Sequence, residues 1–153
     1  MNSCKKLGID IGSTTVKIAI TDSTYSSDRA SWDQEAAPQG MVFSDYERHY
    51  ANIQETLASL IRKAYDQLGD LSVSPMITGS GGLTLAKHLE VPFVQEVISV
   101  STALEHYAPQ TDVAIELGGE DAKIIYFEGG NVEQRMNGIC AGGTGSFIDQ
   151  MAS

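Results

Sequence analysis

Residues 10–18 read DIGSTTVKI, and residues 116–124 read ELGGEDAKI. Both stretches have an acid first, a Gly two places later, a Lys in the eighth place and an Ile in the ninth. Each acid ends a short apolar run and each Lys opens the next, so both stretches predict a β-hairpin with a tight turn. Gly tolerates unusual dihedrals and has no Cβ, so such a turn can bring backbone N–H groups close to a phosphate. Two turns facing each other are predicted to hold a polyphosphate from both sides.

The composition is that of a soluble globular protein and excludes several partners. The 153 residues carry a formal net charge of −10, which argues against a nucleic-acid partner but leaves a nucleotide possible. No apolar run approaches the roughly 20 residues that span a bilayer, so no membrane partner is expected. Lys5 and Lys6 precede an apolar stretch that Asp10 interrupts, which is unlike a signal peptide. The two cysteines, Cys4 and Cys140, favour a reducing compartment, and we expect a cytoplasmic protein.

The apolar pattern predicts an α/β fold. Strands are expected over residues 5–11, 15–22, 40–43, 73–78, 93–95 and 131–136, with Pro75 suggesting an edge. A long helix is predicted from a capping box at Ser44 and Glu47, through Tyr46 and Tyr50, to a stop at Gly69. Shorter helices follow the glycine turn at 78–82, cover 97–107, and begin near residue 145. We interpret this order as one lobe, residues 1–109, and the beginning of a second, residues 110–153. The last helix lacks a stop signal, so we expect the chain to continue in a longer protein.

The two acids of the repeat are candidate metal ligands. A structural hairpin does not need a carboxylate before its turn, where burial costs free energy unless the charge is paired or faces a metal. Asp10 and Glu116 are therefore expected to face Mg²⁺, directly or through water. Neither copy has the Gly-Lys-Ser/Thr of a Walker motif. The turn at 79–82 is not a dinucleotide motif either, because Thr84 stands where a third Gly is needed.

Cys140 precedes a glycine-rich helix start, where backbone N–H groups stabilise a thiolate. A single Cys is most often a small buried residue, but in this position it is also a candidate metal ligand or reactive thiol. One Cys cannot hold an iron–sulfur cluster, so ligation would need other cysteines. His49, His88 and His106 all fall on predicted helices, and we interpret them as surface or packing residues. The acids at 45–47 are explained by the dipole of a helix N-terminus.

The two repeat stretches resemble the phosphate loops of the actin, hexokinase and heat-shock chaperone ATPase superfamily. Within that superfamily, residues 136–147, MNGICAGGTGSF, resemble the ATP-dependent activators of 2-hydroxyacyl-CoA dehydratases and benzoyl-CoA reductase-type enzymes, and the large activase-related form most of all. The similarity runs over nearly the whole chain. Small activators usually have Asp and Gln where Glu116 and Glu120 stand, and Arg where Ser146 stands.

The resemblance implies a ribonuclease-H-like, two-lobed ATPase that works as a homodimer. It implies a 4Fe-4S cluster shared between subunits, with Cys140 as one ligand and a second Cys beyond Ser153. ATP hydrolysis would then drive an electron into an acyl-CoA dehydratase-type partner. The resemblance maps Asp10 and Glu116 onto the metal-side acids, which are the candidate catalytic residues. It maps onto the phosphate loops Gly12, Ser13, Thr14, Thr15, Gly118 and Gly119. Lys17 and Asp121 are further candidates for binding the nucleotide.

Two other functions fit the same residues. One is a small-molecule kinase on the same fold, with an acid as base towards a hydroxyl group. The other is a non-catalytic lobe that serves as an interaction module. Cys140 distinguishes the activator from both. We also expect residues 1–153 alone to bind Mg·ATP poorly and to be inactive, because half of the cleft would be missing.

Overall fold

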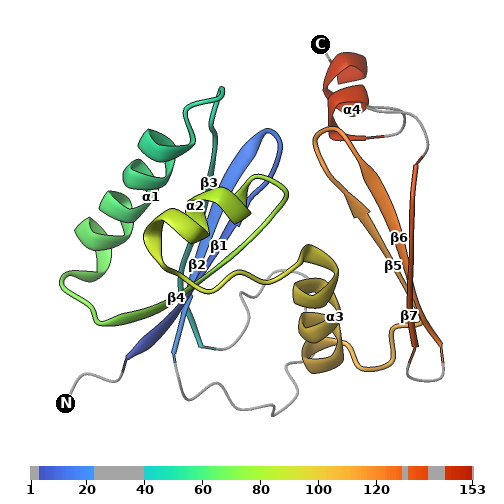
Figure 1. Ribbon diagram of the computed structural model, residues 1–153, viewed down its shortest axis with the longest axis horizontal. Helices are drawn as coiled ribbons and strands as arrows, with labels where there is room; N and C mark the ends of the chain where they lie inside the picture. Colours follow the sequence, from blue (N-terminus) through green and yellow to red (C-terminus); the bar gives the residue numbers. More distant parts are fainter. Residues whose placement is uncertain (1–3, 23–39, 129–130, 138–143, 153) are drawn as a thin grey trace. The chain divides into compact units, whose positions relative to one another are not determined.

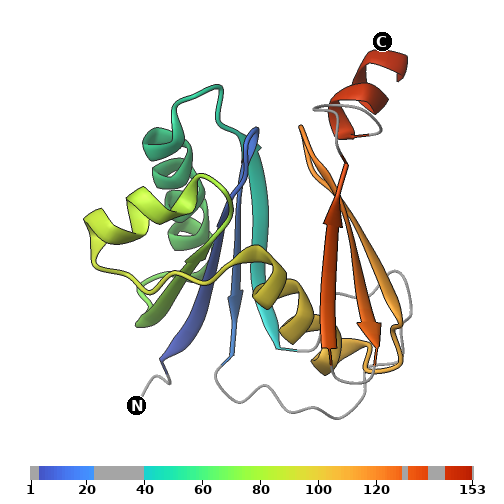
Figure 2. The same cartoon turned by 45° about the vertical axis from the view of Figure 1, so that its right-hand side comes forward.

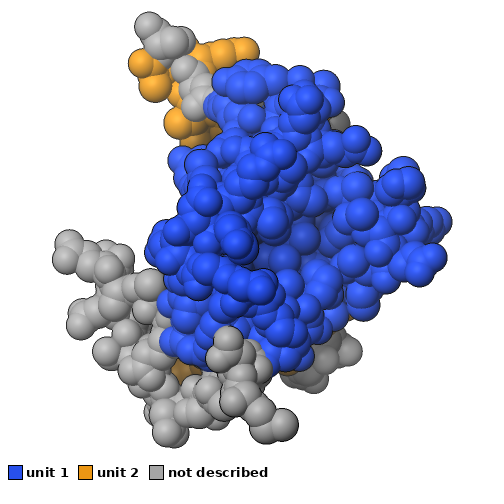
Figure 3. Space-filling model, turned by 90° about the vertical axis from the view of Figure 1, so that its left-hand side faces the viewer, with its two compact units in different colours: residues 1–94 blue, residues 95–153 orange. Residues whose placement is uncertain are grey.

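The computed structural model describes residues 4–22, 40–128, 131–137 and 144–152 (Figure 1). The chain divides into two compact units, residues 1–94 and residues 95–153, which Figure 3 colours separately. Each unit contains one of the two repeat stretches. The lobe boundary between residues 109 and 110 stays a prediction.

Unit 1 is built on a four-stranded sheet with the order β3-β2-β1-β4. β1 (Lys5–Ile11) pairs antiparallel with β2 (Thr15–Thr21), which pairs antiparallel with β3 (Met41–Arg48). β4 (Val73–Thr78) pairs parallel with β1 and forms an edge, as Pro75 predicted. The first hairpin is thus confirmed and occupies the centre of the sheet.

Two helices, α1 (Ile53–Leu68) and α2 (Gly82–Leu89), cover one face of this sheet (Figures 1 and 2). Alternate residues of the hairpin strands point to that face and are buried under the helices. This core fixes the register of the hairpin, because a slip of one residue would turn its apolar side chains to the other face. The core residues are Leu7, Ile9, Ile11, Val16, Ile18, Ile20, Phe43, Leu60, Ala64, Ile77 and Ala86.

The predicted start of the long helix is wrong. Ser44, Tyr46 and Glu47 lie in β3, which runs to Arg48, and α1 begins only at Ile53. The supposed capping box is therefore part of a strand, and the acids at 45–47 do not lie at a helix N-terminus. His49 is likewise not on a helix but follows β3, and it is buried. The strand expected over 93–95 is reduced to a single bridge between Phe93 and Ile77.

Unit 2 contains a three-stranded antiparallel sheet with the order β5-β6-β7. Its strands are β5 (Val113–Leu117), β6 (Ala122–Glu128) and β7 (Asn131–Met136). α3 (Glu96–Tyr107) precedes the sheet and α4 (Gly145–Ala152) follows it (Figure 2). These bounds confirm the second hairpin and the helices expected over 97–107 and from residue 145. His88 and His106 lie on α2 and α3, as predicted.

Candidate functional site

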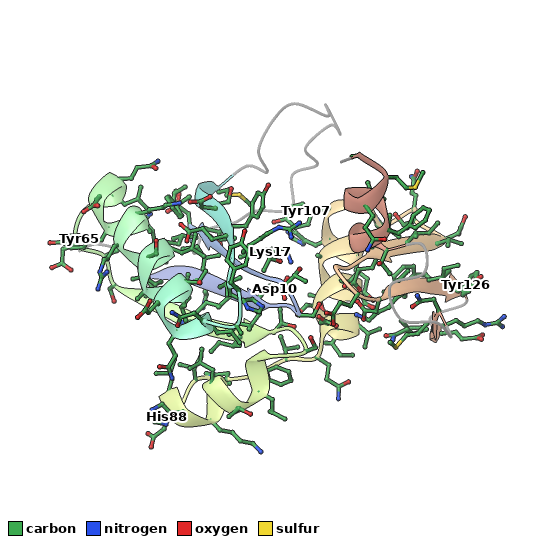
Figure 4. The ribbon with its side chains drawn as sticks, turned by 90° about the horizontal axis from the view of Figure 1, so that it is seen from above. Asp10, Lys17, Tyr65, His88, Tyr107 and Tyr126 are labelled. Carbon is green, nitrogen blue, oxygen red and sulfur yellow. The ribbon has the colours of Figure 1, made fainter. Side chains whose placement is uncertain are left out.

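The turn of the first hairpin is closed by the Gly12 N–H, which donates to the Thr15 carbonyl at 2.9 Å. Asp10 and Lys17 face each other across the strands, with Lys17 Nζ 2.7 Å from Asp10 Oδ2 (Figure 4). A Cβ on Gly12 would lie 4.0 Å from Lys17 Nζ and would meet no atom closer than 3.5 Å beyond its chain neighbours. The ammonium group and the open flank of Gly12 therefore lie on the same side of the turn, which suits an anion.

The second hairpin repeats this backbone geometry. The Gly118 N–H donates to the Asp121 carbonyl at 2.8 Å, and Glu116 faces Lys123 across the strands. The predicted repeat is thus a repeat of strand register and turn closure as well as of sequence. At Gly118, however, a Cβ would lie 2.3 Å from Asp121 Oδ1, so the neighbouring carboxylate occupies the space that is open at Gly12.

The start of α4 packs on the turn of the second hairpin. The Gly145 N–H donates to the Gly118 carbonyl at 2.8 Å, and Thr144 Oγ1 donates to the Gly119 carbonyl at 3.2 Å. Thr144 is fully buried in this contact. Thr144 and Gly145, the described end of the glycine-rich stretch that the sequence singled out, therefore contact the second phosphate-loop candidate.

Lys123 differs from its counterpart Lys17 in burial and in partners. Its side chain is 8% exposed, whereas that of Lys17 is 52% exposed. Lys123 Nζ lies 2.7 Å from Glu96 Oε2, 3.0 Å from Asp121 Oδ2 and 3.5 Å from Glu116 Oε1. Burial works against the ammonium charge, but the three carboxylates outweigh it and raise the pKa of Lys123. Lys123 therefore stays protonated, and Glu116 shares its positive charge with Glu96 and Asp121, which lie closer to Nζ.

This sharing leaves Glu116 incompletely neutralised. Burial raises the pKa of Glu116, Lys123 opposes that effect, and the negative charges of Glu96 and Asp121 add to it. Sequence reasoning did not identify Glu96, because only the packing of α3 brings this residue to the second hairpin.

Both repeat acids keep one buried oxygen without a partner. In the described part of the chain, nothing hydrogen-bonds to Asp10 Oδ1 or to Glu116 Oε2. An unpartnered buried carboxylate oxygen costs free energy, so the fold alone does not explain these acids. Carboxylate oxygens are ligands that Mg²⁺ uses, and both side chains remain partly exposed, at 32% and 30%. Within its own unit, each acid therefore has the chemistry of a Mg²⁺ ligand, direct or through water.

Glu116→Gln is expected to become more stable relative to the wild-type protein as the pH rises from about 4 to 8. The raised pKa means that folded Glu116 keeps its proton where the unfolded carboxyl, with a pKa of about 4.3, has lost it. The stability of the wild-type protein therefore falls as the pH rises through this window, and Gln removes that loss. Urea unfolding across the pH range measures the difference. Glu133→Gln, at an exposed residue of β7, is the control, and an equal pH trend in both variants would contradict the prediction.

A glycine loop after β4 completes the surroundings of the first hairpin. The Gly81 N–H donates to the Ile11 carbonyl at 2.9 Å, at the end of β1. Gly79 has a φ of +96°, and a Cβ there would lie 2.6 Å from Asp10 Oδ1. This loop packs on the Asp10 carboxylate, and its glycine run in the sequence was the signal that could have identified it.

The structure thus brings together the predicted residues of each hairpin within its own unit. Asp10, Lys17 and the turn 12–15 form one group, and Glu116, Asp121 and the turn at 118–119 form the other. Cys140 lies outside the described residues, and Cys4 is exposed. Among the described residues, no three His, Cys, Asp or Glu side chains are grouped to hold a metal ion. The helices described here are all too short or too polar to cross a membrane.

Comparison with known proteins decides the family. Residues 7–153 match the BadF/BadG/BcrA/BcrD ATPase family. The chain belongs to this family. A segment of 46 residues is 44% identical to the (R)-2-hydroxyglutaryl-CoA dehydratase activating ATPase of Acidaminococcus fermentans, covering 29% of this chain and 18% of that protein. The predicted resemblance to dehydratase activators is confirmed at the level of the family.

Solved structures confirm the predicted α/β fold of the actin/hexokinase-type ATPases. Component A of the A. fermentans (R)-2-hydroxyglutaryl-CoA dehydratase is 24% identical with a TM-score of 0.73, over 98% of this chain and 53% of that one. The ADPNP-bound activator of the 2-hydroxyisocaproyl-CoA dehydratase from Clostridium difficile is 24% identical with a TM-score of 0.65, over 97% and 51%. The ethanolamine utilization protein EutJ from Carboxydothermus hydrogenoformans is 13% identical with a TM-score of 0.67, over 99% and 57%. This chain spans about half the length of these solved proteins.

Proposed function

We propose that the protein carrying this chain binds and hydrolyses Mg·ATP, and that each repeat hairpin supplies one phosphate-binding turn. The observation that carries the proposal is the matched geometry of the hairpins. Each pairs an acid with a Lys in the same register, closes its turn through a Gly N–H, and leaves one buried carboxylate oxygen unpartnered. The ADPNP bound to the C. difficile activator supports a nucleotide as the ligand.

The turn residues, the acids and Lys17 have separate roles in this proposal. Ser13, Thr14, Thr15 and Gly119 contact the phosphates, mainly through backbone N–H groups. Gly12 and Gly118 use their N–H groups to close the turns, so they line the phosphates without donating to them. Lys17, exposed above the Gly12 flank, neutralises phosphate charge, and Asp121 fixes the second turn. Asp10 and Glu116 hold Mg²⁺, which supplies charge stabilisation as the terminal phosphoryl group is transferred to water. We assign the first lobe to residues 1–109 and the beginning of the second to residues 110–153.

We further propose that the hydrolysis drives an electron into a (R)-2-hydroxyacyl-CoA dehydratase-type partner. The family membership and the roles of the A. fermentans and C. difficile activators support this step. Cys140 is proposed as a ligand of a 4Fe-4S cluster shared between two subunits in the full-length homodimer. Among described residues only the exposed Cys4 is a cysteine, so the cluster proposal depends on Cys140 and on sequence beyond this chain. We propose the cytoplasm as the location.

The test uses full-length protein purified without oxygen. Wild-type protein is expected to contain iron and sulfide and to release inorganic phosphate from ATP. Cys140→Ala is expected to lose nearly all of the iron, whereas Cys4→Ala, the matched control, keeps it. Iron that persists in Cys140→Ala would overturn the cluster assignment. ATP-dependent phosphorylation of a sugar or acid in place of water would support the kinase instead.

A further inference from the structure

His49 contacts the turn of the first hairpin through both its ring and its backbone. Its ring is buried, with Nε2 3.2 Å from the Gly12 carbonyl oxygen. The Ala51 N–H donates to His49 Nδ1 at 3.0 Å. The His49 N–H donates to the Thr14 carbonyl at 3.1 Å. A residue 37 positions away from Gly12 in the sequence therefore holds two of the carbonyl groups of the turn.

The hydrogen bonds define the proton position on the ring. A backbone N–H can only donate, so Nδ1 must carry the lone pair that accepts from Ala51. In the neutral ring the proton then sits on Nε2, which donates to the Gly12 carbonyl. The ring is thus held as one tautomer, with both nitrogens used.

This contact sets the direction of two amide groups in the turn. In a planar trans peptide, the C=O and the following N–H point in opposite directions. When His49 holds the Gly12 and Thr14 carbonyls, the N–H groups of Ser13 and Thr15 point away from the His49 side. Ser13 is exposed, so solvent or a ligand can reach this part of the turn.

Backbone strain accompanies this arrangement. Tyr50 and Ala51 have φ values of 43° and 66°, in the left-handed region that residues with a Cβ avoid. The turn closes through the Asn52 N–H, which donates to the His49 carbonyl at 2.6 Å. It is this turn that brings the Ala51 N–H back to the ring. Such strain persists only where surrounding contacts hold it, and it is concentrated at functional sites.

We propose that His49 is a positioning residue that orients the Ser13 and Thr15 amides towards a nucleotide phosphate. The inference rests on the proposed function, since it names the group that prepares the first hairpin for the phosphate. His49 itself does not touch the nucleotide. It acts through the carbonyls of the turn.

Asn and Gln separate the two roles of the ring. A Gln amide nitrogen can replace Nε2 as the donor to Gly12, whereas an Asn oxygen can replace only Nδ1 as the acceptor from Ala51. In full-length protein, His49→Gln is expected to keep wild-type affinity for Mg·ATPγS in calorimetry. His49→Asn is expected to bind about tenfold more weakly, because one hydrogen bond to the turn is lost. His88→Asn, on the exposed side of α2, is the matched control and is expected to bind as the wild type does.

Hydrogen exchange gives a second readout that does not depend on nucleotide binding. Amides of the turn 12–15 are expected to exchange faster in His49→Asn than in His49→Gln or His88→Asn. Equal exchange and equal affinity in both His49 variants would overturn the inference, and so would a tenfold loss of affinity in His49→Gln. The affinity of His49→Gln therefore tests the inference even if His49→Asn fails to fold. Wild-type protein that binds no Mg·ATPγS would overturn the proposed function, and the exchange data would then decide whether His49 holds the turn.

Discussion

Gly79→Ala is expected to lower the free energy of unfolding by roughly 3–5 kcal/mol, the largest loss of stability that we predict for a single methyl group. The added Cβ would lie 2.2 Å from the Ile11 carbonyl oxygen and 2.6 Å from Asp10 Oδ1. Ile11 ends the inner strand β1 and is fully buried, so its backbone cannot move aside cheaply. The φ of +96° adds strain that only Gly avoids.

Gly69→Ala provides the matched control for this prediction. Gly69 follows α1 with a φ of +75°, but a Cβ there would meet nothing within 4 Å. The control therefore carries the cost of the backbone conformation alone, with φ +75° and ψ −158°, roughly 1–3 kcal/mol. Urea unfolding of both variants and of the wild-type protein measures the two losses. Equal losses would mean that the glycine loop does not pack on β1 as described.

Asp10→Asn is expected to reduce the rate of ATP hydrolysis by roughly a hundredfold or more, with little change in stability. The Asp10 carboxylate pairs with Lys17 through one oxygen and leaves the other unpartnered and buried. Asn keeps the shape of the side chain but removes the charge that would hold Mg²⁺. The neutral amide pairs more weakly with Lys17, which leaves the ammonium group freer to bind phosphate. The affinity for ATP is therefore expected to fall less than the rate of hydrolysis.

Asp45→Asn is the control for the loss of a paired carboxylate on the same sheet. Asp45 lies in β3 and pairs with Lys63 at 2.7 Å, and a hydrogen bond from Lys63 lowers the pKa of Asp45. This pair is partly exposed and lies outside the proposed machinery, so hydrolysis is expected to continue at the wild-type rate. Phosphate release from Mg·ATP by the full-length protein measures both variants. A rate in Asp10→Asn that matches Asp45→Asn would contradict the metal-side role of Asp10.

The error at residues 44–50 has a specific cause. Tyr46 and Tyr50 recur at a helical interval, and Ser44 and Glu47 have capping-box spacing, so the local pattern favoured a helix. In the structure, Asp45 and Glu47 are paired with Ile18 and Val16 of β2, on the face that α1 covers. Charged residues at inward positions hid the alternation typical of a strand. Their charges are satisfied by Lys63 of α1, which lies 2.7 Å from each, and a local pattern does not contain that contact.

The sequence by itself determined the two hairpins, their turn glycines, the acids beside them and the family, because these features depend on neighbouring residues. Strand register, turn closure and the opposition of each acid to its Lys all follow from a spacing of seven residues. Only the tertiary structure brought His49, Gly79 and Glu96 to these hairpins. His49 contacts the Gly12 carbonyl, and Glu96 shares Lys123 with Glu116. Gly79 lacks the Cβ that would collide with β1. Contacts of this kind depend on how distant segments pack, so they leave no period or spacing in the sequence.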